Sequence, residues 1–98
     1  MATLTADEVR LRLQELPNWT LADDAIFRKF TFAGFPDAVA FIVRLGFGAE
    51  SADHHPDLFV NYKRVTVTFT THSEGGVTEK DFRGAREADE IAKGLGGA

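Results

Sequence analysis

The chain has 98 residues, of which 44% are hydrophobic and nine are phenylalanine, so we expect one folded domain spanning residues 1–98 and exclude an extended disordered chain. Its net charge of -4 argues against direct binding to nucleic acid, which usually needs a basic face. The sequence contains no cysteine, which excludes a thiolate metal site and a cysteine nucleophile. No window approaches the roughly 20 apolar residues of a membrane span, and we expect a cytoplasmic protein without a membrane partner.

The first predicted element is a helix. Thr5 and Glu8 have the spacing of a capping box, and Leu4 and Val9 have the spacing of the apolar pair that often accompanies one. Apolar residues at helical spacing continue from there, and Pro17 follows the predicted end.

Two apolar runs then flank a polar pair that is typical of a hairpin. The runs are "NWTLA" and "AIFRKFTF", and Asp23 and Asp24 lie between them. Ile26 and Phe30 share a face with Arg28, so the alternation is imperfect. We nevertheless predict two antiparallel strands here.

The stretch "FPDAVAFIVRLGFGAESAD" returns to helical spacing. Pro56 disfavours helical geometry at His55, so this helix is predicted to stop at about His54. "DLFVNY" and "RVTVTFTTH" are then predicted to be strands joined by a tight turn around Lys63. In the second of these strands, alternation places one polar set on a common face: Thr66, Thr68, Thr70 and His72.

A final helix is predicted from "VTEKDF", where Thr78 and Asp81 repeat the capping-box spacing. The order is therefore helix, strand, strand, helix, strand, strand, helix. We predict an α+β fold, in which three helices pack on one face of a four-stranded antiparallel sheet. The threonine-rich face of the sheet would be left open.

All three histidines of the chain fall within residues 49–72. If the preceding helix runs to its predicted end, Glu50 and His54 lie four residues apart and can pair on its surface. The carboxylate and the negative end of the helix dipole would then favour the imidazolium form of His54. His55 must diverge from His54 because Pro56 imposes extended geometry. Two such imidazoles can address two sides of one small ligand.

Simpler roles account for each of these residues taken alone. A histidine is most often a surface or structural residue, Glu50 a solvated helix residue, Asp81 a cap and Tyr62 half-buried packing. Three histidines can also hold zinc, but adjacent histidines rarely face one ion and the spacing matches no metal motif, so we expect no metal. None of the simpler roles explains why the histidines occur only here.

The spacing of seven residues resembles a family signature. In chain order they are Glu50, His54, His55, Pro56, Tyr62, His72 and Asp81. This pattern is similar to that of the pterin-4a-carbinolamine dehydratase family, with every position filled. The resemblance extends to "LTADE", to "FRKFTFAGF" and to "GVTEKDF", where that family has its first helix, first hairpin and last helix, so it covers almost the whole chain.

The resemblance implies the same α+β fold and association into homodimers or homotetramers. It implies dehydration of 4a-hydroxytetrahydropterin to quinonoid dihydropterin, which recycles tetrahydropterin for aromatic amino acid hydroxylation, with a pterin as substrate and no bound cofactor. His54 would then be the principal general acid at the C4a hydroxyl, and His55 an alternative acid or the base at N5. Glu50 would orient and charge His54.

The resemblance also implies the remaining site residues. The positions expected to bind substrate are Asp53, Thr70, Thr71 and His72. His72 is also expected to be catalytic, by sharing in proton transfer. The positions expected to have structural roles near the site are Pro56, Tyr62 and Asp81. Because the polar strand face leads to His72, that face would form the floor of the pterin pocket.

The resemblance leaves two alternative functions open. Some animal members of the family act as dimerisation cofactors for a homeodomain transcription factor, and such a role would use an exposed helical face and leave the histidines optional. The second alternative is a different physiological pterin, for example one connected with molybdenum cofactor metabolism, since none of these positions distinguishes pterin side chains.

Overall fold

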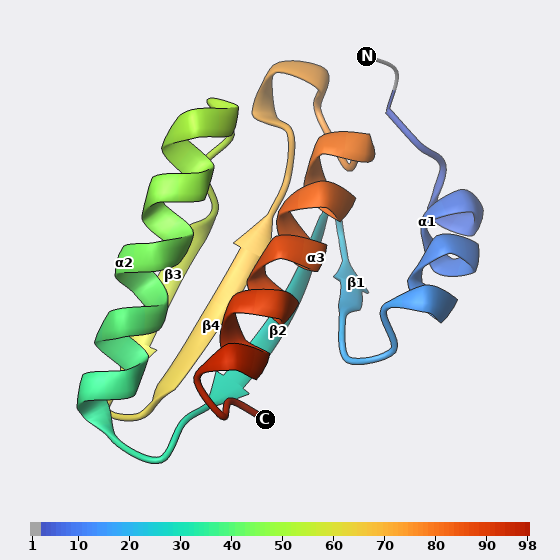
Figure 1. The fold of residues 1–98 in the computed structure, drawn as a ribbon. Coiled ribbons are helices and arrows are strands. Elements are labelled where there is room, and N and C mark those ends of the chain that lie inside the picture. Colours follow the sequence, from blue (N-terminus) through green and yellow to red (C-terminus); the bar gives the residue numbers. More distant parts are fainter. Residues whose placement is uncertain (1–2) are drawn as a thin grey trace.

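A computed structural model describes residues 3–98, and these form three α-helices and four strands (Figure 1). The helices are α1 (Ala6–Arg12), α2 (Phe35–Ala52) and α3 (Glu79–Gly94). The strands are β1 (Thr20–Ala22), β2 (Ala25–Thr31), β3 (Asp57–Asn61) and β4 (Arg64–Phe69), and they form an antiparallel sheet in the order β1-β2-β4-β3. The predicted α+β fold and order of elements are confirmed. No helix within residues 3–98 is long and apolar enough to span a membrane.

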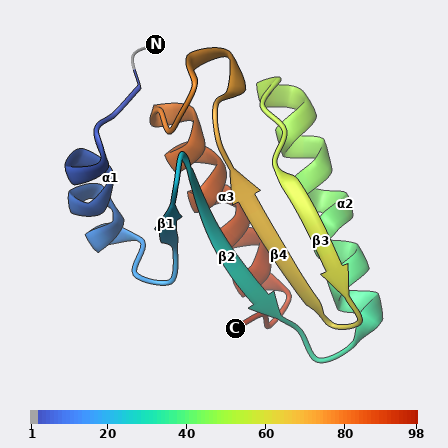
Figure 2. The same ribbon diagram turned by 180° about the vertical axis from the view of Figure 1, so that it is seen from behind.

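The helices occupy one side of the sheet. α2 and α3 lie side by side over one face, and α1 lies beside β1 at the edge opposite β3, as the two views show (Figures 1 and 2). The core between sheet and helices is rich in phenylalanine, with Phe30, Phe41, Phe69 and Phe82 all buried. On the other face, Thr66 and Thr68 alternate with the buried residues of β4, so the predicted open, threonine-bearing face is confirmed.

The predicted local signals act as expected at helix starts and hairpin turns. Both capping boxes form, at Thr5 for α1 and at Thr78 for α3. Asp23 adopts a left-handed φ of 54° in the turn between β1 and β2, a conformation that aspartate tolerates better than most residues. Arg28, which interrupts the apolar alternation of β2, donates a hydrogen bond to Asp89 at 2.7 Å. Its guanidinium is therefore satisfied at the margin of the core.

Two predicted element ends are wrong. α2 ends at Ala52, because Asp53 adopts a left-handed φ of 50° and closes the helix, two residues before the predicted end at His54. β4 ends at Phe69, so His72 does not share a strand face with the threonines. His72 instead opens a short 3-10 turn, His72–Glu74, because the preceding Thr71 turns into the interior, where it is 3% exposed.

Candidate active site

The three histidines line one cleft, although they come from three different segments. His54 follows the end of α2, His55 precedes β3, and His72 follows β4. The cleft has a volume of about 330 Å³, and its wall is formed by these three side chains with Asp53, Thr70, Thr71, Ser73 and Lys80. Sequence reasoning expected all of these residues at the site except Ser73 and Lys80.

His54 is held from two sides. Its Nε2 lies 2.6 Å from Oδ1 of Asp81, and its ring stacks on Phe69 with centroids 5.9 Å apart and planes inclined by 17°. Only 12% of the side chain is exposed. Because a carboxylate oxygen accepts hydrogen bonds, Nε2 donates to Asp81, and Nδ1 is left as the ring nitrogen that can exchange a proton.

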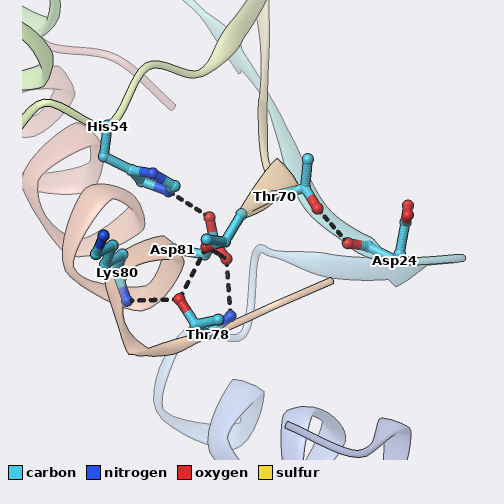
Figure 3. Close-up of polar contacts among 7 residues, drawn as sticks. Asp24, His54, Thr70, Thr78, Lys80 and Asp81 are labelled. Atoms are coloured by element: carbon cyan, nitrogen blue, oxygen red, sulfur yellow. Dashed lines mark hydrogen bonds and ion pairs between the residues drawn. The ribbon is translucent and has the colours of Figure 1, made fainter. Parts of the chain in front are cut away.

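Asp81 anchors this arrangement from the interior. It is 0% exposed, and its Oδ2 accepts the backbone N–H of Thr78 and the hydroxyl of Thr71, each at 2.8 Å. The hydroxyls of Thr71 and Thr78 also lie 2.8 Å apart. Figure 3 shows the carboxylate between His54 and the start of α3. A buried carboxylate with this many hydrogen bonds is rigid, and it fixes the orientation of His54.

Glu50 pairs with His55, and the predicted pair of Glu50 and His54 is wrong. Oε1 of Glu50 lies 2.8 Å from Nε2 of His55. The spacing argument assumed a continuous helix, whereas the left-handed Asp53 ends the helix and allows His54 to reach Asp81 of α3. The side chains of His55 and Glu50 are 56% and 81% exposed, so solvent weakens their interaction.

The predicted substrate-binding residues contribute to the wall in different ways. Thr70 donates its hydroxyl to the backbone oxygen of Asp24 at 2.6 Å (Figure 3). The hydroxyl of Thr71 is engaged by Asp81. Asp53 is exposed on the cleft wall. The two threonines therefore position the strand end, whereas the side chain of Asp53 is open to a ligand.

Tyr62, which the resemblance implied to have a structural role near the site, does not line the histidine cleft of the single chain. Tyr62 lies in the turn between β3 and β4, with φ 57°, at the end of the hairpin away from the histidines. It is 61% exposed. Pro56 connects His55 to β3, and it does not line the histidine cleft. Signature spacing alone does not show that a residue reaches the site, because β3 carries the chain away from it.

Lys80, which was not predicted at the site, carries a signal in the sequence. It lies in the first turn of α3, between two acidic residues, where the helix dipole disfavours a cation. A residue that breaks a local rule often serves a site. Ser73 had no comparable signal. Within the described part of the chain, no three histidine or acidic side chains are grouped as metal ligands.

Comparison with known proteins places these features in a family. The model of the family described as Pterin 4 alpha carbinolamine dehydratase matches residues 2–91. A relative from Chloroflexus aurantiacus is 45% identical over 93% of this chain and 98% of its own. A relative from Mycobacterium sp. (strain KMS) is 47% identical over 93% and 97%. Both carry a provisional assignment as pterin-4-alpha-carbinolamine dehydratases.

Solved structures agree. The crystal structure of a transcriptional coactivator/pterin dehydratase from Brucella melitensis is 43% identical, with a TM-score of 0.88 over 92% of this chain and 98% of that one. A pterin dehydratase-like protein identified as a RuBisCO assembly factor in the alpha-carboxysome is 21% identical, with a TM-score of 0.62 over 76% and 86% of the two chains, and shares the fold. The chain therefore belongs to the pterin-4-alpha-carbinolamine dehydratase family.

Proposed function

We propose that this protein dehydrates 4a-hydroxytetrahydropterin to quinonoid dihydropterin, the step that allows tetrahydropterin to be recycled after aromatic amino acid hydroxylation. The C4a–O bond breaks, the hydroxyl oxygen takes its electron pair and a proton, and water leaves. N5 loses its proton, and the electrons of that N–H bond form the new C=N bond. Family membership and a cleft lined by three imidazoles support this proposal.

The contact between His54 and Asp81 carries the assignment of the general acid. Nε2 of His54 is committed to Asp81 at 2.6 Å, so the imidazole exchanges its proton at Nδ1. Burial of the carboxylate and stacking on Phe69 reduce the rotation of the ring. A fixed imidazole that can protonate the departing hydroxyl is worth about 10²- to 10⁴-fold in rate.

His55 and His72 receive the remaining roles. His55 is more exposed than His54 and is held by Glu50 alone among the described side chains, which suits a base that takes the N5 proton and passes it to solvent. His72 also lines the cleft, in the turn after β4. We assign it to orientation of the pterin ring, together with Asp53.

Stopped-flow measurement of carbinolamine loss tests the proposal. The wild-type protein is expected to accelerate the loss, and His54→Ala is expected to reduce turnover by about 10²-fold or more. His54→Gln is the matched control for folding, since its amide can still donate to Asp81 but cannot transfer a proton. No acceleration by the wild type contradicts the proposed function, and wild-type turnover in His54→Gln contradicts the role of His54.

We also propose that the protein assembles into homodimers or homotetramers. One face of α2 exposes apolar side chains, here called the α2 stripe: Phe35, Val39, Val43 and Phe47. The neighbouring edge strand β3 is exposed at all five positions, and α2 and β3 lie on the same side of the molecule (Figures 1 and 2). An apolar helix face and an open strand edge both favour association.

Light scattering on the purified protein tests this assembly. The mass is expected to be twice or four times that of one chain, and Phe47→Glu is expected to lower it, because that side chain is 76% exposed at the end of the stripe. Leu11→Glu is the matched control, since Leu11 is similarly exposed on α1. A monomeric wild type contradicts the assembly.

A further inference from the structure

A second cleft adjoins the histidine cleft. It has a volume of about 430 Å³ and lies between the C-terminal half of α2 and the N-terminal half of α3. The two clefts share two residues, His54 and Lys80, so they meet at the proposed general acid. The second volume falls in the range of small-ligand pockets. A substrate bound at the histidines therefore has space beside it for a substituent.

The walls of the second cleft are mainly apolar and closely packed. Leu45, Ala49 and the ring of Phe69 line its interior. Gly84 allows α3 to approach β4, because a Cβ there would collide with the ring of Phe69. These walls suit the carbon atoms of a short substituent rather than a chain of polar groups.

The rim of this cleft carries two cations without carboxylate partners. Among the described residues, neither Lys80 nor Arg83 lies within 4.0 Å of a carboxylate oxygen. By contrast, Arg86 on the same helix pairs with Glu79 at 3.1 Å. Lys80 also occupies the first turn of α3, where the dipole disfavours a cation. Two such cations in a chain of net charge -4 form a local positive site.

Glu87 limits this positive site to the part nearest His54. It lies one turn beyond Arg83 on α3, and its carboxylate rests where a Cβ of Gly48 would be. Charge along α3 therefore runs from Lys80 and Arg83 beside the histidines to a carboxylate at the far end of the cleft. An anion would be stabilised only within a short reach of the pterin ring.

We propose that the second cleft holds the C6 substituent of the pterin and that Lys80 and Arg83 select substituents with a negative charge, such as a phosphate. This inference rests on the proposed function, because it requires the pterin ring to occupy the histidine cleft. Lys80 lies at the junction and contacts the anion as a point charge, while Arg83 provides the planar fork that matches phosphate geometry.

A pair of pterins that differ in one group tests the inference. Binding of 6-hydroxymethyl-7,8-dihydropterin and of its phosphate ester is measured by calorimetry at low ionic strength. The ester is expected to bind about tenfold more tightly or better, and the preference is expected to fall as salt is added. Lys80→Gln and Arg83→Gln should each bring the ratio of the two affinities toward one. Arg86→Gln is the matched control and should keep the wild-type ratio.

Each other outcome overturns the inference in a recognisable way. Equal affinity of the wild type for the two pterins, or a preference that survives in Lys80→Gln/Arg83→Gln, overturns the substituent site and leaves the proposed dehydration standing. If inorganic phosphate binds as tightly as the ester and displaces the ester but not the uncharged pterin, the cleft is a site for a free anion, and the inference is overturned. Failure of both pterins to bind overturns the proposed function as well.

Discussion

The capping boxes at the starts of α1 and α3 use the same hydrogen bond in different surroundings. At α1, the side chain of Glu8 accepts the N–H of Thr5 at 2.8 Å in an exposed position. At α3, Asp81 accepts the N–H of Thr78, also at 2.8 Å, but it is fully buried. Only the second carboxylate has further partners in the core and the site, Thr71 and His54.

The difference comes from the segments that pack around each helix start. Water surrounds Glu8, so its hydrogen bond stabilises one helix end and nothing beyond it. Asp81 lies beneath the ends of α2 and β4, so the same cap also fixes the ring of His54. A local motif can thus acquire a second role without any change in its own spacing, and sequence spacing alone cannot distinguish the two cases.

Replacing each carboxylate by its amide should give the largest contrast between the two boxes. Asp81→Asn is expected to lower kcat by about 10²- to 10⁴-fold with a smaller effect on KM, because the amide disturbs the tautomer and orientation of His54. Glu8→Gln should leave turnover at the wild-type level. Stopped-flow kinetics across pH checks both variants.

The pH profile separates positioning from a purely structural role of Asp81. A positioning role predicts that Asp81→Asn changes the shape of the profile, because the ring that transfers the proton has lost its orienting partner. A uniform loss with an unchanged profile, or equal turnover in Asp81→Asn and the wild type, would show that the two boxes are equivalent.

Removing the hydroxyls of Thr5 and Thr78 should give a smaller difference between the two capping boxes, and this difference is in the free energy of unfolding. Thr5→Ala is expected to reduce the free energy of unfolding by about 1 kcal/mol, the usual value for a cap. Thr78→Ala should cost about 2–3 kcal/mol, because Thr78 is 0% exposed and its hydroxyl also bonds to Thr71. Urea unfolding measures both, with Thr78→Ser as the control that keeps the hydroxyl. Equal losses for the two alanine variants would refute the difference in burial.

The smallest predicted effect is on the pH dependence of stability, and it concerns only the exposed capping box at the start of α1. The backbone N–H of Thr5, followed by its hydroxyl, lowers the pKa of Glu8 below the ordinary value of 4.5. A lowered pKa of a carboxyl stabilises the fold above its unfolded pKa, and that stability is lost as the pH falls through the folded pKa. The Tm advantage of the wild type over Glu8→Gln should therefore be constant near neutrality and should shrink below about pH 4.5. An advantage that persists at pH 2–3 would exclude this charge effect.

The sequence predicted most of the fold because its signals there are local. Capping spacing, alternation and the polar pair at Asp23 each act over a few neighbouring residues. Both capping boxes, the turn at Asp23 and the alternation within β4 were confirmed. The errors lie where a distant segment decides the outcome. Thr71 turns inward to meet Asp81 of α3, so the predicted strand did not continue to His72.

The candidate site was predicted as a set of residues but not as a set of contacts. The three histidines do line one cleft, whereas helical spacing paired Glu50 with His54, and neither the capping spacing nor the resemblance predicted the contact between Asp81 and His54. Resolving that pairing requires knowing how α3 packs against the end of α2. Lys80 could have been found from its unfavourable place in the first turn of a helix, because that violation is visible in the sequence.

Asp53 has a consequence for attempts to evolve this protein in the laboratory. Its left-handed backbone is one that glycine would adopt with less strain, while its carboxylate faces the histidine cleft. Selection for heat tolerance alone would therefore favour Asp53→Gly, and selection for turnover would oppose it. A library screened first for heat tolerance and then for turnover would meet a conflict between its two criteria at this position.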